Sequence, residues 1–292
     1  MRKPDSYDNK AYQKPVTKHD FSENDDGITL QRHSVIRGIS LAYGCYLLLP
    51  MALLLMGSVG SSWTNTLLPT GLTTRWYQDL WLDASFRNAF GTSLVVALSA
   101  CAINTVLALP LAYSLYHRSG QTGSWAARLV SAMPVAVPAI TLGFGYVMVF
   151  NTDWLPWLGS LPLLIAAHTI YTLPYLTNTL LTDLKHLQLD ALEDAAATLG
   201  ASPWAQFSGV VVPNLRHSLI SGLVMVAALS VGEFQLSNLL TSFQIRTYPV
   251  VLLQAFYGAT GFACAATVIL LSLAAMSALV SSSLGNKARW TA

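Results

Sequence analysis

The fold assignment of this chain depends on the stretch TDLKHLQLDALEDAAATLGASPWAQFSGVVVP, residues 182–213. Long apolar runs flank it on both sides, and no other long segment between Ser34 and Ser283 combines polar character with a helical pattern. Long loops with secondary structure of their own are usually functional. We therefore expect residues 183–213 to project from a membrane domain and to contact something outside it.

The composition indicates a membrane protein. Of 292 residues, 53% are hydrophobic and only 10% are charged, and the mean hydropathy is +0.48. Soluble domains carry about 25% charged residues. The net charge of +2 comes from dispersed basic residues beside apolar runs, which is typical of a topology signal and does not favour nucleic-acid binding. Cys45, Cys101 and Cys264 lie in apolar runs without metal-ligand spacing, so we expect core residues and no metal or cofactor.

We expect an all-α, polytopic membrane fold with about six transmembrane helices. Residues 1–33 are predicted to be a disordered tail, because the segment has almost no apolar periodicity, and residues 34–292 are predicted to be one transmembrane domain. Residues 58–85 suit a loop with a short interfacial helix, since their tryptophans and tyrosine fit a headgroup belt. The predicted spans are residues 36–57, 89–116, 129–150, 161–181, 215–240 and 259–284.

The third predicted span is a poor straight helix. It contains Pro134 and Pro138, followed by Gly143 and Gly145. Irregular backbone at membrane depth is tolerated only against protein or a water-filled cavity. We therefore expect this span to face other parts of the protein or a water-filled cavity.

Basic residues near the span ends indicate the orientation. With the N-terminus inside, eight of them are cytoplasmic and three are outside, which places both termini and the loop of residues 183–213 in the cytoplasm. The cytoplasmic set is Arg32, Arg37, Arg118, Arg128, Lys185, Arg216, Lys287 and Arg289, and the outer set is Arg75, Arg87 and Arg246.

Two short helices are predicted inside the loop. Asp190, followed three residues later by Glu193, resembles a capping-box start, and Gly200 suits the left-handed position that ends a helix. Ser202 and Pro203 fit the N-cap and first position of a second helix. Apolar residues follow a helical spacing on both helices: Leu192, Ala195, Ala196, Leu199, Trp204 and Phe207. Such a surface fits a groove on a partner or the membrane surface, and the pattern leaves both open.

The segment LEDAAATLGASPWAQFSGVVVP, residues 192–213, resembles the EAA signature of permease subunits of ABC importers. That signature is Glu-Ala-Ala, three residues, Gly, nine residues, Ile, one residue, Leu-Pro. Aligned on Gly200, the matching positions are Asp194, Ala195, Ala196, Val210, Val212 and Pro213. Asp replaces Glu, and Val replaces Ile and Leu, so charge sign and apolar character are kept. The resemblance extends from about Ser34 to the end of the chain.

This resemblance implies a permease of the type I ABC importer fold, with a cytoplasmic coupling helix, in a bacterial inner membrane. In that family the loop docks in a groove of a cytoplasmic ATPase dimer, a second permease subunit completes the pathway, and a periplasmic binding protein delivers the substrate. The permease itself is not an enzyme, and this chain has no G-x-x-x-x-G-K-[ST] segment. The docking residues implied are Glu193, Asp194, Ala195, Ala196, Leu199, Gly200, Ala201, Ser202, Trp204, Phe207 and Pro213.

Glu233 is the most informative residue outside the loop, because a carboxylate inside a span usually faces a cavity or a partner. It lines the substrate path or, alternatively, is hydrogen-bonded near the outer end of the span. Further candidates for the pathway are Gly143, Gly145, Gln235 and Asn238. The amides suit contacts between helices better than ligand contacts, and His168 suits a hydrogen-bonded core position.

The resemblance is strongest to the polyamine and 2-aminoethylphosphonate branch of these permeases, on VGEF of residues 231–234 and SSWTNTLLPTGLTTRWYQDL of residues 61–80. It implies a small polar solute, 2-aminoethylphosphonate or a polyamine, with ferric iron or thiamine as alternatives from neighbouring branches. An ATP-independent secondary transporter is the alternative from another class. It would usually show an internal repeat, and we find no convincing one in the sequence.

Overall fold

A computed structural model describes residues 22–63, 66, 68–118 and 124–289. The chain divides into two units, one ending at Leu53 and one beginning at Leu54. In the described residues, the first unit is most of one helix, α1 (Ser22–Val59), which contains Pro50. Residues 1–21 of the predicted tail lie outside the described residues, whereas residues 22–33 begin α1.

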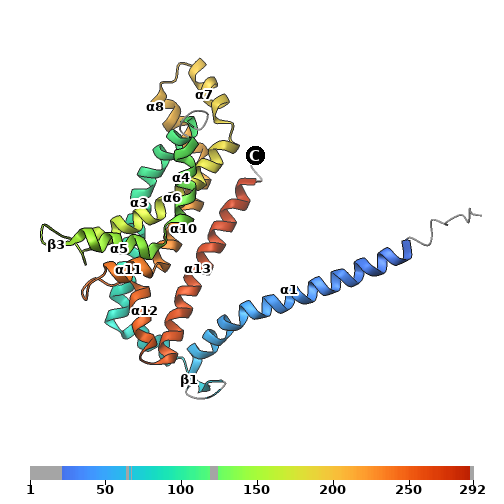
Figure 1. The fold of residues 1–292 in the computed structure, drawn as a ribbon, viewed down its shortest axis with the longest axis vertical. Helices are drawn as coiled ribbons and strands as arrows, with labels where there is room; N and C mark the ends of the chain where they lie inside the picture. The colour runs from blue at the N-terminus through green and yellow to red at the C-terminus, as the bar shows by residue number, and fades with distance from the viewer. Residues whose placement is uncertain (1–21, 64–65, 67, 119–123, 290–292) are drawn as a thin grey trace, which may run out of the picture. The chain divides into compact units, whose positions relative to one another are not determined.

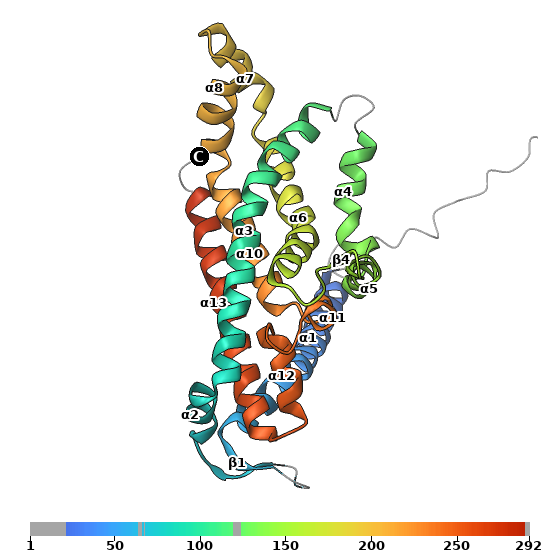
Figure 2. The ribbon, with the colours of Figure 1, turned by 90° about the vertical axis from the view of Figure 1, so that its left-hand side faces the viewer.

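The second unit is helical, with long helices that run between two ends (Figures 1 and 2). The helices α7 and α8 form one end, and α2, α12 and the β1 hairpin lie at the other. The long helices are α3 (Ala84–Arg118), α6 (Leu161–His186), α10 (Arg216–Gly232) and α13 (Thr260–Arg289). The shorter ones are α2 (Arg75–Leu82), α4 (Ser124–Ala136), α5 (Ala139–Phe150), α7 (Leu189–Thr198), α8 (Pro203–Gln206), η1 (Phe207–Val211), α9 (Val212–Asn214), α11 (Gln235–Leu240) and α12 (Tyr248–Phe256).

Two small antiparallel hairpins are the β-structure of the described residues. In the first, β1 (Gly60–Ser62) pairs with β2 (Thr70–Leu72), and in the second, β3 (Asn151–Thr152) pairs with β4 (Leu155–Pro156). Neither closes a sheet that could span a membrane, so the all-α assignment is confirmed. The short helix predicted within residues 58–85 is α2.

Helices long and apolar enough to cross a membrane carry three of the predicted spans: Ile36–Val59, Ala84–Arg118 and Thr260–Leu279. A fourth is counted if Pro203–Asn214 and Arg216–Gly232, which are bent by 66°, form one span. The predicted fourth span is α6, which has 26 residues but contains His168 and several threonines that lower its hydropathy. Each predicted span therefore has a helical counterpart, although two are interrupted.

The interruptions fall in the third and fifth predicted spans. The third is split into α4 and α5 at Val137 and Pro138, as its prolines predict, because proline lacks the N–H group that would continue the helix. The fifth, predicted as continuous over residues 215–240, ends as a helix at Gly232 and resumes at Gln235. Glu233 between them has an extended backbone, with φ −74° and ψ 118°. The helix α12 lies in a segment for which the sequence predicts only an outer loop.

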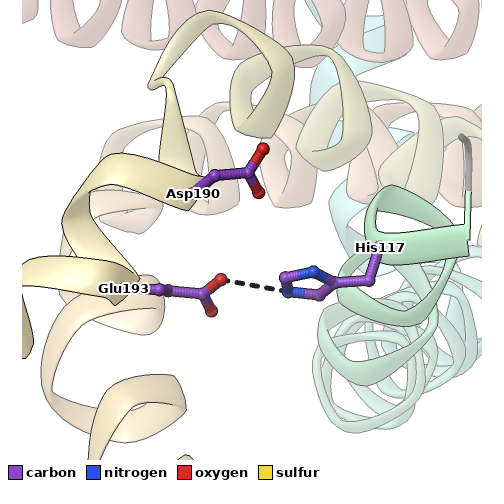
Figure 3. A group of neighbouring side chains, drawn as sticks. All are labelled: His117, Asp190 and Glu193. Atoms are coloured by element: carbon purple, nitrogen blue, oxygen red, sulfur yellow. Dashed lines mark ion pairs between the residues drawn. The ribbon is translucent and has the colours of Figure 1, made fainter. Parts of the chain in front are cut away.

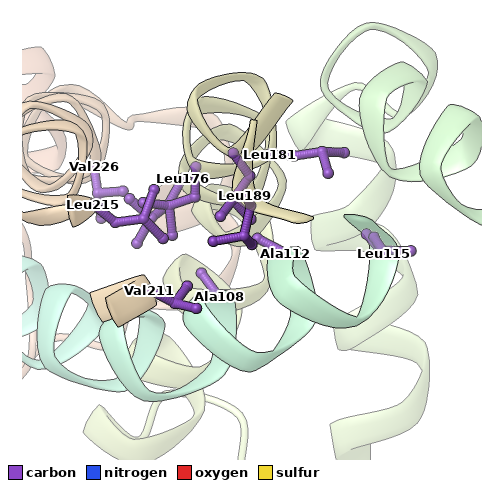
Figure 4. Close-up of a cluster of buried hydrophobic side chains, with 11 residues drawn as sticks. Ala108, Ala112, Leu115, Leu176, Leu181, Leu189, Val211, Leu215 and Val226 are labelled. Carbon is purple, nitrogen blue, oxygen red and sulfur yellow. The ribbon is translucent and has the colours of Figure 1, made fainter. Parts of the chain in front are cut away.

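A cluster of buried apolar side chains joins the α7 end to the long helices (Figure 4). Ala108 and Ala112 of α3 lie beside leucines of α6, and small residues at this spacing let two helices approach closely. The loop itself contributes Leu189 and Val211, each fully buried. The loop is therefore packed onto the helical bundle by its own side chains.

Candidate functional site

The first helix of the loop, α7, begins two residues earlier than the predicted capping box allows. Gln188 is its N-cap, in the left-handed conformation with φ 48°, and Asp190 lies inside the first turn. The prediction of Asp190 as N-cap is therefore wrong. Leu189 is fully buried in the apolar cluster of Figure 4, and burying it fixes where the helix starts. Asp190 still lies at the positive end of the helix dipole, where a carboxylate is favourable.

The end of α7 matches the prediction. Gly200 has φ +82°, its N–H donates to the carbonyl of Ala197 at 2.9 Å, and the N–H of Ala201 donates to the carbonyl of Ala196 at 3.1 Å. These two bonds are the Schellman motif, which needs a left-handed residue at this position. No heavy atom lies within 4 Å of a Cβ built on Gly200, so the backbone conformation, and not space, requires glycine.

The second helix also starts as predicted. The Ser202 side chain accepts a hydrogen bond from the N–H of Ala205 at 3.3 Å, and Pro203 occupies the first turn. The helix α8 continues through the π-helical turn η1 and the short α9 to Asn214. The loop is thus two helical segments joined by a turn at residues 199–202.

The turn and the outer side of α7 form an exposed surface. Leu199 is 88% exposed and Trp204 is 74% exposed, which is unusual for large apolar residues on a polar loop. We call the following residues the docking surface; Ala196 and Ala201 are half-buried and the others are exposed: Leu192, Asp194, Ala195, Ala196, Leu199, Gly200, Ala201, Ser202 and Trp204. Pro213 is exposed as well, at the far end of the second helical segment.

Glu193, unlike its exposed neighbour Asp194, is buried on α7. It is only 8% exposed, and its two carboxylate oxygens have separate partners on α3. The Tyr113 hydroxyl donates to Oε1 at 2.7 Å, and His117 Nε2 lies 3.2 Å from Oε2 (Figure 3). The sequence predicts that Glu193 belongs to a docking surface. In the structure its carboxylate instead faces the helical bundle. Phe207 also faces inward, with its ring edge-on to Tyr113 at 5.2 Å.

Asp190 completes a small group of side chains with His117 and Glu193 (Figure 3). One ligand-type atom from each residue lies within 4.8 Å of the others, and the atom types suit a divalent cation. The sequence shows no metal-ligand spacing here, since the residues come from helices about seventy positions apart. Both oxygens of Glu193 already have protein partners, so the close approach of these residues needs no ion to explain it.

In the interruption of the fifth predicted span, the Glu233 side chain caps the start of α11. Its carboxylate accepts hydrogen bonds from the backbone N–H groups of Leu236 at 2.8 Å and Ser237 at 2.9 Å, and from the Ser237 hydroxyl at 3.2 Å. The residue is 7% exposed. The backbone N–H groups of Leu236 and Ser237 lie in the first turn of α11 and have no acceptor within the helix, and lipid would offer them none. Glu233 is therefore hydrogen-bonded within the protein, as the alternative interpretation of its sequence position has it.

His168 of α6 bridges the same interruption. Its Nδ1 lies 2.8 Å from Ser230 Oγ on α10, and its Nε2 lies 3.0 Å from Ser237 Oγ on α11. The prediction of a hydrogen-bonded core histidine is confirmed. A turn further along α6, the Thr172 hydroxyl accepts from the Asn104 amide at 2.7 Å, which ties α3 into the same polar layer.

The remaining pathway candidates separate into two kinds. A Cβ on Gly143 would lie 2.7 Å from Leu239 Cδ1, so this glycine lets α5 pack closely on α11. Gly145 is exposed and lines an apolar groove along α5 with Tyr146 and Phe150. Gln235 and Asn238 are both exposed and three residues apart, so they share one face of α11. The structure therefore exposes two amides on α11 while it buries Glu233.

A comparison with known families gives one match. The family described as "Binding-protein-dependent transport system inner membrane component" matches residues 104–284, which is more than half of the chain. This segment runs from the middle of α3 into α13 and includes the whole loop and both interrupted spans.

Several curated proteins are similar to this chain. PhnV of Salmonella paratyphi A, named as a 2-aminoethylphosphonate transport system permease protein, is 28% identical over 194 residues, or 66% of this chain and 72% of PhnV. PotI of Escherichia coli K12, named as a putrescine transport system permease protein, is 26% identical over 211 residues, 70% of this chain and 74% of PotI. The cysT protein of Marchantia polymorpha, named for sulfate transport, is 29% identical over 221 residues, 70% of each chain.

The fold is also found in solved structures. A chain of a bacterial alginate ABC transporter in complex with an alginate pentasaccharide-bound periplasmic protein superposes with a TM-score of 0.69, covering 90% of this chain and 96% of that chain. Another structure, of a bacterial ABC transporter that imports alginate, gives a TM-score of 0.64 over 91% and 98% of the two chains. Both are 14% identical to this chain, so the likeness concerns the fold.

Proposed function

Because this chain belongs to the family of binding-protein-dependent transport system inner membrane components, we propose that it couples import of a small polar solute to a separate cytoplasmic ATPase. Members of this family are permease subunits of ABC importers. Our proposal adds that the loop of residues 183–213 is the coupling element and that a second permease subunit completes the pathway. It also places both termini in the cytoplasm and a periplasmic binding protein at the outer mouth, in line with the periplasmic partner of the alginate transporter.

One observation carries the coupling role. Leu199 and Trp204 are 88% and 74% exposed at the tip of a loop whose turn is held by backbone hydrogen bonds. A rigid turn that presents large apolar side chains fits a preformed groove on a partner at a low entropic cost. A helix pair lying on the membrane surface, the other candidate, would direct these side chains toward lipid. In the structure, Leu199 ends α7 and Trp204 lies in α8, and these two helices form the end of the second unit opposite α2 and α12 (Figures 1 and 2).

The docking surface can be tested by co-purification of the permease with its ATPase. We expect Leu199→Asp and Trp204→Ala to lower ATPase retention at least tenfold, because central aromatic and aliphatic contacts dominate such interfaces. Trp81→Ala is a matched control, since Trp81 is 76% exposed but lies on α2 at the opposite end. Retention that is unchanged in both loop variants would contradict the docking assignment.

The transported solute is proposed to be 2-aminoethylphosphonate or a polyamine. What supports this choice is similarity to PhnV and PotI, whose names specify 2-aminoethylphosphonate and putrescine. The exposed amides Gln235 and Asn238 are proposed to line the pathway beside the groove that includes Gly145, and Gly143 keeps α5 close to α11. Glu233 is proposed to act by holding α11 and not by meeting an amine, since its carboxylate is already satisfied.

Uptake measurements separate the solutes. Proteoliposomes that contain the permease complex and its binding protein would be supplied with labelled 2-aminoethylphosphonate, putrescine or sulfate. We expect ATP-dependent uptake of one of the first two, and a several-fold fall with Gln235→Ala plus Asn238→Ala. Uptake of sulfate alone would overturn the proposed solute while it leaves the coupling role intact.

A further inference from the structure

We propose that Glu193 is a positioning residue that fastens the coupling loop to α3 through Tyr113 and His117, so that movement of the loop is passed to α3. The inference rests on the proposed coupling function and extends it to a helix with which the loop has no direct chain connection. Along the chain, the loop continues from α6 and leads into α10. Side-chain contacts therefore have to make the connection to α3.

The contact is specific, and the carboxylate at its centre is buried. The two oxygens of Glu193 bind two different groups on α3, the Tyr113 hydroxyl at 2.7 Å and His117 Nε2 at 3.2 Å. Tyr113 and His117 are four residues apart, one turn of α3, and their rings meet edge-on at 4.6 Å. Hydrogen bonds to a charged acceptor are about twice as strong as neutral ones and are directional. The contact therefore fixes the orientation of α7 as well as its distance from α3.

Apolar contacts on either side support the same connection. Leu189, one turn before Glu193, is fully buried in the cluster that includes Ala112 and Leu115 of α3 (Figure 4). On the other side of the turn, Phe207 packs edge-on against Tyr113. Tyr113 thus contacts both helical segments of the loop, one through its hydroxyl and the other through its ring.

The geometry explains why this contact would transmit force. Asp194 belongs to the docking surface, whereas its neighbour Glu193 faces α3. Two adjacent residues of one helical turn therefore link the proposed partner to α3. The helix α3 has 35 residues and reaches from the loop to the opposite end of the unit (Figure 2). A displacement of α7 of the size that ATPase closure imposes would therefore move the end of α3 with it. Apolar contacts are not directional. Without the hydrogen bonds of Glu193, α7 could therefore slide over the apolar cluster.

The test uses the assembled complex of permease, ATPase and binding protein. We expect Glu193→Gln and Tyr113→Phe each to lower the stimulation of ATPase activity by loaded binding protein about tenfold, with the ATPase still co-purifying. The loss in the double variant should be smaller than the two single losses combined, because both substitutions weaken the contact between Glu193 and Tyr113. Tyr257→Phe removes a hydroxyl from a residue that is 87% exposed, and should leave the stimulation unchanged.

A second measurement follows the permease alone. Hydrogen exchange of the α7 backbone amides should be faster in Glu193→Gln than in the unmodified chain, with exchange in α10 unchanged. Full stimulation in both single variants, or additive losses in the double variant, would overturn the proposal. Loss of the ATPase from the Glu193→Gln complex would overturn it too, because the residue would then support docking itself. If the unmodified permease does not retain an ATPase, the proposed function fails instead, which is a separate result.

Discussion

His168 Nε2 and Ser237 Oγ lie 3.0 Å apart, although 69 positions separate the two residues in the chain. Through this contact α6 holds the start of α11, and through Ser230 it holds the end of α10. The Ser237 hydroxyl also donates to the Glu233 carboxylate, so one continuous set of hydrogen bonds closes the interruption of the fifth span. Broken helices at membrane depth survive only where neighbouring groups satisfy the freed backbone in this way.

Removing the imidazole should destabilise the permease. His168→Ala leaves the hydroxyls of Ser230 and Ser237 without this partner and opens a cavity, at a cost of about 2–4 kcal/mol. Thermal unfolding of the detergent-solubilised permease measures the effect, with His186→Ala on the exposed end of α6 as the matched control. Equal melting temperatures for the two variants would show that the bridge contributes little.

Glu233→Gln should lower transport without preventing assembly. The amide keeps the shape but replaces one acceptor oxygen with a donor that faces backbone N–H groups, so the cap on α11 is weakened by about 1.5–3 kcal/mol. We expect ATP-dependent uptake to fall about tenfold, while the complex still purifies intact. Unchanged uptake in Glu233→Gln would mean that the cap is dispensable.

Gly200→Ala should weaken ATPase binding by about fivefold. The residue has φ +82°, and a left-handed conformation costs a non-glycine residue about 1 kcal/mol. Gly209→Ala is the matched control, since it is a glycine in the same loop with equally open surroundings but a helical conformation. Titration of the ATPase against each permease variant gives the two dissociation constants. Equal weakening by the two substitutions would contradict a role for the left-handed turn.

Gly143→Ala should loosen the packing of α5 on α11. The added methyl would lie 2.7 Å from Leu239 Cδ1, and overpacking of this kind typically costs about 1–3 kcal/mol. Gly145→Ala, two residues further, meets no heavy atom within 4 Å and should be neutral or slightly stabilising. Thermal unfolding of the two variants compares them directly, and a similar melting temperature for both would mean that Leu239 moves aside without cost.

The sequence by itself determined the features that depend on short stretches of chain. Apolar runs separated by polar segments predict an all-α membrane fold, the signature around Gly200 predicts the family, and the prolines before Ala139 predict the break in the third span. Gly200 and Ser202 were also predictable as a helix end and a helix start, since a left-handed glycine and a capping hydroxyl act on backbone groups within four residues.

The tertiary structure decided which way the charged side chains face. Glu193 and Asp194 are equivalent in a helical pattern, and only the position of Tyr113, 80 residues away, turns Glu193 toward α3. Likewise, burial of Leu189 and not the capping-box pattern at Asp190 sets the start of α7. Glu233 became a helix cap because α10 ends at Gly232, an interruption that His168 of another helix stabilises. Contacts between distant residues set these outcomes, and no local sequence signal specifies them.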